Sequence, residues 1–362
     1  MKPLFSPPTL IPWPCSPGDS PGRLKTDPPD FRVDEIAAYA PSGEGQFYFV
    51  QVEKENVASG RFVRVLADRA GVPSSEIGLA GQKDKRAITR QWVSLPDRAD
   101  LRSIDGPLGD DAAIRVLEIA RHHRKLKTGH LRGNRFTVIA RDVASDAHAA
   151  IAERVAHVRR EGFANSYGAQ RFGGGDTVKV GWDALGGARI KNRRLRRLGV
   201  SALQASLFNH WLDARAKDDL MATVITGDEL KKRETGGLFV CEDVKTDQAR
   251  LDAGELVQAG PIFGWKFMRP RAEAAHRETA ILDRFGLAPD DFRVLKKLAL
   301  GTRRPARIWP EDLDVSCTPE AVTLTFTLPP GAYATVLARM TISAALEIGP
   351  PRSTVVSDSR SE

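Results

Sequence analysis

The sequence of 362 residues is poor in cysteine and has no long apolar run, and each shortage argues against a class of protein. Its three cysteines, Cys15, Cys241 and Cys317, lie far apart and form no Cys-x-x-Cys pair, which argues against a structural zinc site. Their odd number fits a reducing compartment. No apolar run is long enough to span a bilayer. The proline-rich N-terminus lacks the pattern of a signal peptide, so we expect a cytoplasmic location.

Motifs for nucleotide cofactors and for common hydrolases are also missing. The glycine run at 173–175 lacks the Lys-Ser/Thr ending of a P-loop and the spacing of a dinucleotide fingerprint, and 78–83 misses the P-loop spacing as well. No Ser-His-Asp arrangement can be argued. His122 and His123 are adjacent on a predicted strand, where side chains point to opposite faces, so they make a poor chelating pair. We therefore expect neither a cofactor nor a metal.

What the sequence does have is a core and a positive charge. Apolar residues make up 41%, enough for a folded protein. Fifty-four Lys and Arg against 46 Asp and Glu give a net charge of +8. The excess favours a polyanionic partner, nucleic acid first, although many proteins without such a partner are also basic.

Strand patterns dominate both ends of the chain, and helical patterns dominate the middle. Alternation or apolar runs predict strands at 31–36, 47–52, 77–80, 91–95, 114–120, 133–140 and 321–328. Helices are predicted at 56–70, 147–161 and 201–216, through much of 265–301, and from 332 to about 346. The simplest assembly pairs the late strand with the early sheet. We expect an α+β fold with a mixed or antiparallel sheet and a helix-rich insertion.

The most informative segment is 78–91, where a single carboxylate, Asp84, lies among Lys83, Lys85, Arg86 and Arg90. The flanking patterns place it in a loop between two strands. A carboxylate beside several cations stays ionised and can act as a nucleophile or a steering charge. On this local pattern alone, a solvated surface charge or a helix cap is the commoner outcome.

The sequence Ala-Gly-Gln-Lys-Asp at 80–84, followed by Ala87, Thr89 and Gln91, resembles the catalytic motif of the TruD family of tRNA pseudouridine synthases. Further segments resemble the family in the expected order, at 165–173, 201–209 and 328–339. Two positions depart from it: Ser166 stands where an aromatic residue is expected, and Met340 replaces an expected glutamate, which removes a salt bridge near the sheet.

The resemblance implies a pseudouridine synthase fold and the isomerisation of a uridine, at position 13 in the D arm of tRNA. Asp84 would be the nucleophile, and Lys25 would keep it ionised. Phe136 would stack on the target base, with Asn134 hydrogen-bonding nearby. By local pattern alone, Lys25 is an exposed lysine and Phe136 a core residue. The group that removes the C5 proton is not evident, and the sequence does not choose between attack on the ring and attack on the sugar.

The resemblance also implies a basic RNA-binding cleft and a monomer that binds tRNA. The candidate RNA contacts are Lys83, Arg86, Arg124, Lys125, Lys127, Arg171, Arg193, Arg194, Arg196 and Arg197. The run that contains the last four could equally be a solvated loop. The predicted domains are a proline-rich arm (1–24), a discontinuous catalytic domain (25–170 and 306–348), an insertion (171–305) and a disordered tail (349–362).

Two other functions compete with this interpretation. A non-catalytic RNA-binding protein would use the same cations, but it gains nothing from a carboxylate that repels phosphates. A metal-dependent nuclease would need several carboxylates near Asp84, and none is close in sequence.

Overall fold

The computed structural model describes residues 10–349, which form two compact units. We call residues 18–156, 310–331 and 341–349 the sheet unit, and residues 10–17, 157–309 and 332–340 the helical unit. The first nine residues of the predicted arm and the predicted tail from 350 onward lie outside the described residues. The predicted domain boundaries stay predictions. No helix within 10–349 is both long and apolar enough to cross a membrane.

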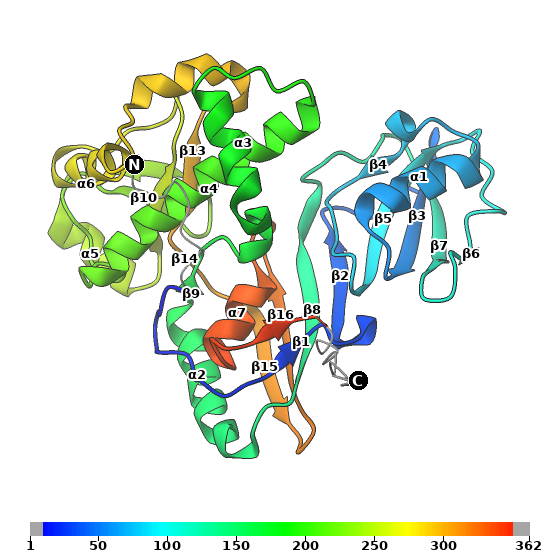
Figure 1. Ribbon diagram of the computed structural model, residues 1–362, viewed down its shortest axis with the longest axis horizontal. Helices are drawn as coiled ribbons and strands as arrows, with labels where there is room; N and C mark the ends of the chain where they lie inside the picture. The colour runs from blue at the N-terminus through cyan, green and yellow to red at the C-terminus, as the bar shows by residue number, and fades with distance from the viewer. Residues whose placement is uncertain (1–9, 350–362) are drawn as a thin grey trace, which may run out of the picture. The chain divides into compact units, whose positions relative to one another are not determined.

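The sheet unit is built on one large sheet that joins the early strands to three late ones (Figure 1). Its strands are β1 Arg23–Leu24, β2 Phe31–Ala37, β3 Phe47–Glu55, β4 Gly78–Leu79, β5 Ile88–Pro96, β6 Gly106–Pro107, β7 Ala113–His122, β8 Leu131–Arg141, β15 Glu311–Cys317, β16 Ala321–Leu328 and β17 Glu347–Ile348. The short 3-10 helices η1 Pro28–Asp30, η2 Ser74–Glu76 and η3 Ser145–Ala147 connect them.

The strand order is β15-β16-β8-β2-β5-β3-β7-β6, with β1 beside β8 and β17, and β4 beside β5. The β2–β5 and β1–β17 pairs are parallel, and the other pairs are antiparallel. The predicted mixed sheet and the pairing of the late strand with the early sheet are therefore confirmed. Register places Phe326 opposite Phe136, and Phe136 opposite Val33. Because side chains alternate along a strand, these three residues share one face.

Helix α1 Ser59–Ala70 covers β3 and β5 and closes the core of this unit (Figure 1). Its apolar stripe buries Phe62 and Leu66 against Val52 and Val93, among others. Gly71 ends the helix with φ of 64°, a left-handed conformation that glycine adopts without steric cost. The predicted helix is confirmed, except that it begins at Ser59 and not at Asn56.

The helical unit is organised around the long helix α4, whose buried side chains supply much of its core (Figure 1). Its elements are α3 Asp176–Leu185, α4 Arg193–Lys217, α5 Val244–Asp252, α6 Ala272–Asp283, η4 Ala169–Arg171, η5 Gly173–Gly175, η6 Pro289–Leu298, the sheet β11 Leu238–Val240, β10 Glu229–Lys232, β12 Leu256–Ile262 and β13 Thr302–Pro305, and the pair β9 Phe163–Ala164 and β14 Arg307–Ile308. Helices α2 His148–Glu161 and α7 Ala334–Thr341 have residues in both units.

Two predicted helix ends are wrong. Helix α4 begins eight residues before the predicted start, because Asn192 caps it by accepting a hydrogen bond from the Leu195 amide at 3.0 Å. Helix α7 ends at Thr341 instead of continuing to about 346. There the Ser343 hydroxyl donates to the Gly18 carbonyl at 3.1 Å, and the chain then turns to place β17 beside β1.

Helices α3 and α4 approach closely at two glycines. A Cβ atom built on Gly181 would lie 2.1 Å from the Gly199 carbonyl oxygen, too close for any relaxation by a side chain. Gly181→Ala should therefore lower the free energy of unfolding by about 1–3 kcal/mol despite the better helix propensity of alanine. Thermal or urea denaturation measures it. Gly186→Ala is the control, since its nearest backbone oxygens are 3.6 and 3.7 Å away. Equal stability of the two variants would contradict the close packing.

Candidate active site

Two side chains of the sheet unit hydrogen-bond the main chain of the Asp84 loop. The Ser59 hydroxyl, at the start of α1, accepts from the Lys83 amide at 3.0 Å and donates to the Lys83 carbonyl at 2.9 Å. Lys54, on β3, donates from Nζ to the Asp84 carbonyl at 2.8 Å and to the Val57 carbonyl at 2.7 Å. The Asp84 side chain keeps 38% of its surface exposed, so a rigid loop presents a reachable carboxylate.

Lys54 is fully buried, and its charge is costly there. Burial lowers the pKa of Lys54 from 10.5 to about 8; the Asp84 carboxylate opposes this change and the charge of Lys83 adds to it. In either protonation state the amine can donate to both carbonyls. The hydrogen bonds of Lys54 therefore go to the backbone of the loop, while its charge also interacts with the Asp84 carboxylate.

The Asp84 carboxylate has its own cation, as the resemblance implied. Lys25 Nζ lies 3.1 Å from Asp84 Oδ2, and the Lys25 side chain is only 8% exposed. Lys25 has φ of 59°, an uncommon conformation for a residue with a side chain, of the kind that collects at functional sites. The segment is tied to β8 on both sides: Leu24 pairs with Ala140, and the buried Asp30 accepts from Arg141 Nη2 at 2.7 Å.

An aromatic row links this ion pair to β8. Lys25 Nζ lies 3.9 Å from the centre of the Phe31 ring, a cation–π contact. Phe31 meets Phe136 edge-on at 6.0 Å, and Phe136 stacks on Phe326 at 5.3 Å. Phe136 is 7% exposed, so it is a core residue of the sheet, as its local pattern indicates. Asp84, Lys25 and Phe136 thus share one region of the sheet face.

Asn134, two residues before Phe136 on β8, belongs to a buried polar group on the same face. Its Oδ1 accepts from Lys83 Nζ at 2.8 Å, and Lys83 Nζ lies 2.5 Å from Glu35 Oε2. Glu35 Oε1 accepts from the Trp92 amide at 3.3 Å. Because the Lys83 side chain is buried and bonded to Glu35 and Asn134, it is not open to an RNA phosphate. The predicted RNA contact of Lys83 stays a prediction that its burial disfavours, and its contacts place it in the support of the site.

The other cations predicted in this unit have different surroundings. Arg124 and Lys127 are exposed after β7, whereas Lys125 donates to the Ser75 carbonyl at 2.5 Å. Arg86 is partly buried, and its Nε has no hydrogen-bond partner within the described chain. Their contacts with RNA stay predictions.

The cations predicted in the helical unit are four arginines at the start of α4 and Arg171 at the end of η4. Arg193, Arg194 and Arg197 are exposed and Arg196 is half-buried, all within the first turns of the helix. This is the end where the helix dipole disfavours positive charge, so the local structure gains nothing from them. Arg171 donates to the Ser201 hydroxyl on the same helix.

His122 packs into an aromatic group and makes no metal site. Its ring lies 4.3 Å from that of Phe49 and 5.2 Å from that of Tyr39. Burial lowers the pKa of His122, with the neighbouring charges of His123 and Arg124 adding to the effect. Among the residues that the structure describes, no three His, Cys, Asp or Glu side chains gather as metal ligands.

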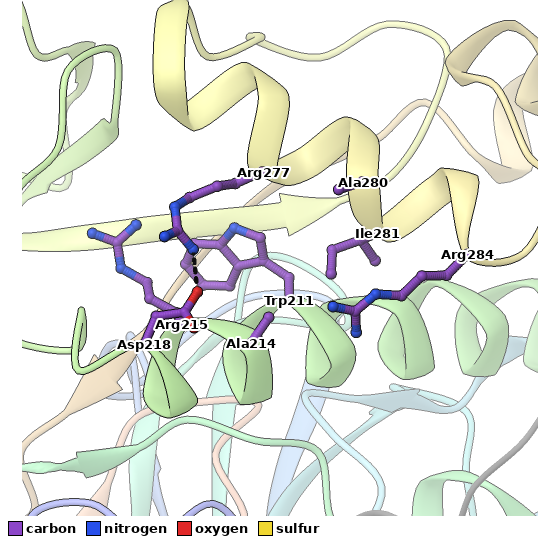
Figure 2. Close-up of a pocket in the computed structure, with 8 residues that line it drawn as sticks. All are labelled: Trp211, Ala214, Arg215, Asp218, Arg277, Ala280, Ile281 and Arg284. Atoms are coloured by element: carbon purple, nitrogen blue, oxygen red, sulfur yellow. Dashed lines mark hydrogen bonds and ion pairs between the residues drawn. The ribbon is translucent and has the colours of Figure 1, made fainter.

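The helical unit has a pocket of its own, of about 190 Å³, between α4 and α6 (Figure 2). Trp211 lies on the α4 side, and Arg277 reaches across from α6 to bond Asp218 at 2.6 Å. The lining residues are Trp211, Ala214, Arg215, Asp218, Arg277, Ala280, Ile281 and Arg284. Its one carboxylate is paired with arginine, so it has the chemistry of a helix–helix contact and not of a second catalytic centre.

Two supporting residues, Glu35 and Lys54, were missed by sequence reasoning although a signal was present. Both are charged residues in the buried phase of a strand: Phe31, Val33 and Glu35 alternate inward on β2, as Val50, Val52 and Lys54 do on β3. A charge at a position where the alternation requires an apolar residue indicates a specific buried partner.

The comparisons with known proteins agree with this geometry. The family model described as "tRNA pseudouridine synthase D (TruD)" matches residues 16–188 and 178–341. The chain belongs to the TruD family of tRNA pseudouridine synthases. It is 42% identical over 346 residues to the tRNA pseudouridine synthase D of Anaeromyxobacter dehalogenans, covering 90% of this chain and 94% of that one. It is 37% identical over 328 residues to that of Thermus thermophilus, covering 88% of each.

A solved structure shares the fold. The putative tRNA pseudouridine synthase D (TruD) from Methanosarcina mazei matches with a TM-score of 0.70, over 92% of this chain and 96% of that one. Its sequence identity is 21%, so the match speaks for the fold alone. The α+β fold expected from the sequence is confirmed.

Because Lys54 is buried, we expect the free energy of unfolding to depend on pH. Since its pKa is lower in the folded than in the unfolded chain, the unfolded chain binds more protons between about pH 8 and 10.5. Stability contributed by Lys54 should therefore rise with pH in that window, by up to about 3 kcal/mol. Urea denaturation from pH 7.5 to 9.5 should give a stability difference, wild type minus Lys54→Met, that grows with pH. The exposed Lys85→Met is the control, and a flat difference for both would contradict a buried ammonium.

Proposed function

We propose that this tRNA pseudouridine synthase isomerises the uridine at position 13 of tRNA, with Asp84 as its nucleophile. The observation that carries the assignment of Asp84 is its ion pair with Lys25, 3.1 Å long, on a loop whose backbone is bonded to Ser59 and Lys54. The carboxylate is partly exposed, whereas its lysine partner is buried. A cytoplasmic location and a monomeric state stay predictions.

The reaction needs one group that bonds reversibly to the substrate. The N1–C1′ glycosidic bond breaks, the uracil turns, and the C5–C1′ bond forms; C5 then loses a proton and N1 gains one. In this proposal a carboxylate that is negatively charged adds to the ring or to C1′ and leaves again, so nothing is consumed. Lys25 pairs with that carboxylate at 3.1 Å and orients it.

The target base must leave the stack of the RNA to reach Asp84. In our proposal the edge of the Phe136 ring that remains accessible contacts the base, and the row of Phe31, Phe136 and Phe326 keeps that ring in place. Exposed cations such as Arg124 and Lys127 then neutralise nearby phosphates.

The alternative, a non-catalytic RNA-binding protein, does not account for the lysine–aspartate pair. A binder gains nothing from a carboxylate among cations that attract phosphate, nor from the strained backbone at Lys25. Retention of full tRNA binding with no conversion of any uridine by the wild-type protein would favour that alternative.

Removal of the Asp84 charge should stop the reaction. Asp84→Asn keeps the shape of the side chain, so pseudouridine formation should fall by at least about a thousandfold while tRNA affinity stays equal or rises. Nucleoside analysis of tRNA after incubation measures the first, and filter binding the second. Asp34→Asn, on the neighbouring strand β2, is the control and should retain activity. Substantial turnover by Asp84→Asn would remove Asp84 from the mechanism.

Lys25 should affect turnover more than folding. Lys25→Met removes the charge beside Asp84, and we expect single-turnover rates at saturating tRNA to fall at least about tenfold with little change in melting temperature. Lys25→Arg should be only partly tolerated, because a planar guanidinium does not replace a point charge. Ordinary turnover by Lys25→Met would make Lys25 a structural lysine.

The arginines at the start of α4 are proposed to bind the tRNA backbone. Replacing Arg193, Arg194, Arg196 and Arg197 together by Gln should weaken binding to all tRNAs and flatten the dependence of affinity on salt, since fewer counterions are released. Helix stability should be equal or greater, because positive charge leaves the helix N-terminus. The rate at saturating tRNA should change little. An unchanged salt slope would place these residues off the binding surface.

A further inference from the structure

The buried pair of Glu35 and Lys83 has a consequence for the base that the site accepts. An ammonium group has three donors and no acceptor, so the atom of Asn134 that faces Lys83 at 2.8 Å must be its carbonyl oxygen. This decides the amide orientation chemically, in a case where oxygen and nitrogen are otherwise hard to assign. The Asn134 Nδ2 group is therefore turned away from Lys83.

The orientation is fixed because Lys83 cannot move. Both main-chain groups of Lys83 are bonded to the Ser59 hydroxyl, and its ammonium lies 2.5 Å from Glu35 Oε2. Glu35 is fixed in turn, because its second oxygen accepts from the Trp92 amide. The side chains of Lys83 and Glu35 are 4% and 1% exposed, so water does not compete.

The hydrogen bond of the Asn134 side chain is made by Oδ1. Its Nδ2 group therefore has two donor hydrogens and no acceptor among the described residues. Asn134 is half-buried and lies on the same sheet face as Phe136, next to Glu35 in register. It therefore presents donors, and donors only, on the sheet face that carries Phe136, beside the side chain of Lys83, the residue that precedes Asp84.

We propose that the Glu35–Lys83 pair orients Asn134 so that its Nδ2 donates to O4 of the target base, which makes Asn134 a specificity-determining residue for uracil over cytosine. Uracil has only carbonyl acceptors at C2 and C4, whereas cytosine has an amino donor at C4. A donor that faces O4 of uracil would face the amino group of cytosine. Two donors that face each other lack an acceptor, which lowers the affinity for cytosine. Glu35 and Lys83 are positioning residues in this scheme. It rests on the proposed function of the site.

The test compares the affinity for two unmodified tRNA transcripts, one with uridine and one with cytidine at the modified position. All proteins carry Asp84→Asn so that the uridine is not converted, which nucleoside analysis checks. The cost of unstacking each base is the same for every protein variant. A change in the uridine-to-cytidine affinity ratio between variants therefore measures a change in how the site binds the base. We expect the ratio to be about tenfold higher with Asn134 than with Asn134→Ala.

The decisive variant is Asn134→Asp, which is nearly isosteric. One carboxylate oxygen would face Lys83 and the other would offer an acceptor to the base, so the ratio should shift towards cytidine relative to Asn134→Ala. The double variant Glu35→Leu with Lys83→Met removes both buried charges together, which stability tolerates better than the loss of one. Although the double variant still contains Asn134, it should lose the preference for uridine. Lys83→Arg keeps hydrogen-bond donors at this position and should retain more of that preference.

The outcomes separate this inference from the proposed function. If the wild-type protein forms pseudouridine but Asn134→Asp keeps the uridine preference of Asn134, the inference is overturned and the function stands. The same holds if the double variant folds and keeps its ratio. If the double variant does not fold, Asn134→Asp alone decides. If the wild-type protein forms no pseudouridine, the proposed function fails first.

Discussion

The site depends on one electrostatic arrangement: a partly exposed carboxylate is held by cations that are buried. Lys25 pairs with the carboxylate of Asp84, and Lys54 bonds the carbonyl of the same residue. The first contact orients the side chain, and the second fixes the backbone that carries it. Burying these ammonium groups is unfavourable, and the contacts with Asp84 and with main-chain carbonyls offset part of that cost.

The sheet supplies the rigidity that such an arrangement needs. Lys54 projects from β3, which pairs along its length with β5, the strand that follows directly after the loop. Glu35 projects from β2, which pairs with β5 at Arg32–Asp34. Phe136 and Asn134 come from β8, whose partners β2 and β16 lie on either side of it. Each reactive or positioning group therefore lies on a regular strand or is bonded to one. The exposed Asp84 carboxylate is the part of the site that remains open to a substrate.

The sequence predicted most strands of this sheet but not β15 or the short β1, β6 and β17. It also predicted the position of Asp84 between two strands and, through family resemblance, its pairing with Lys25. It did not predict that Lys83, next to Asp84, turns inward. Local pattern cannot distinguish Lys83 from Lys85, which flank Asp84, because the partner that buries Lys83 is Glu35, distant in sequence. The end of α7 was missed for the same reason, because Ser343 bonds a segment that is distant in sequence. The start of α4 was missed for a local reason: its cap, Asn192, lies within a run of basic residues.

The central claim is that this chain converts one uridine of tRNA by itself, with the groups that contact the uracil supplied by the sheet unit. The most direct measurement is a single-turnover incubation of the full chain with an unmodified tRNA transcript and no added cofactor, followed by mapping of pseudouridine to single nucleotides. The account predicts close to one pseudouridine per tRNA, at position 13 of the D arm. Transcripts that are bound but unconverted, or converted at another position only, would contradict it.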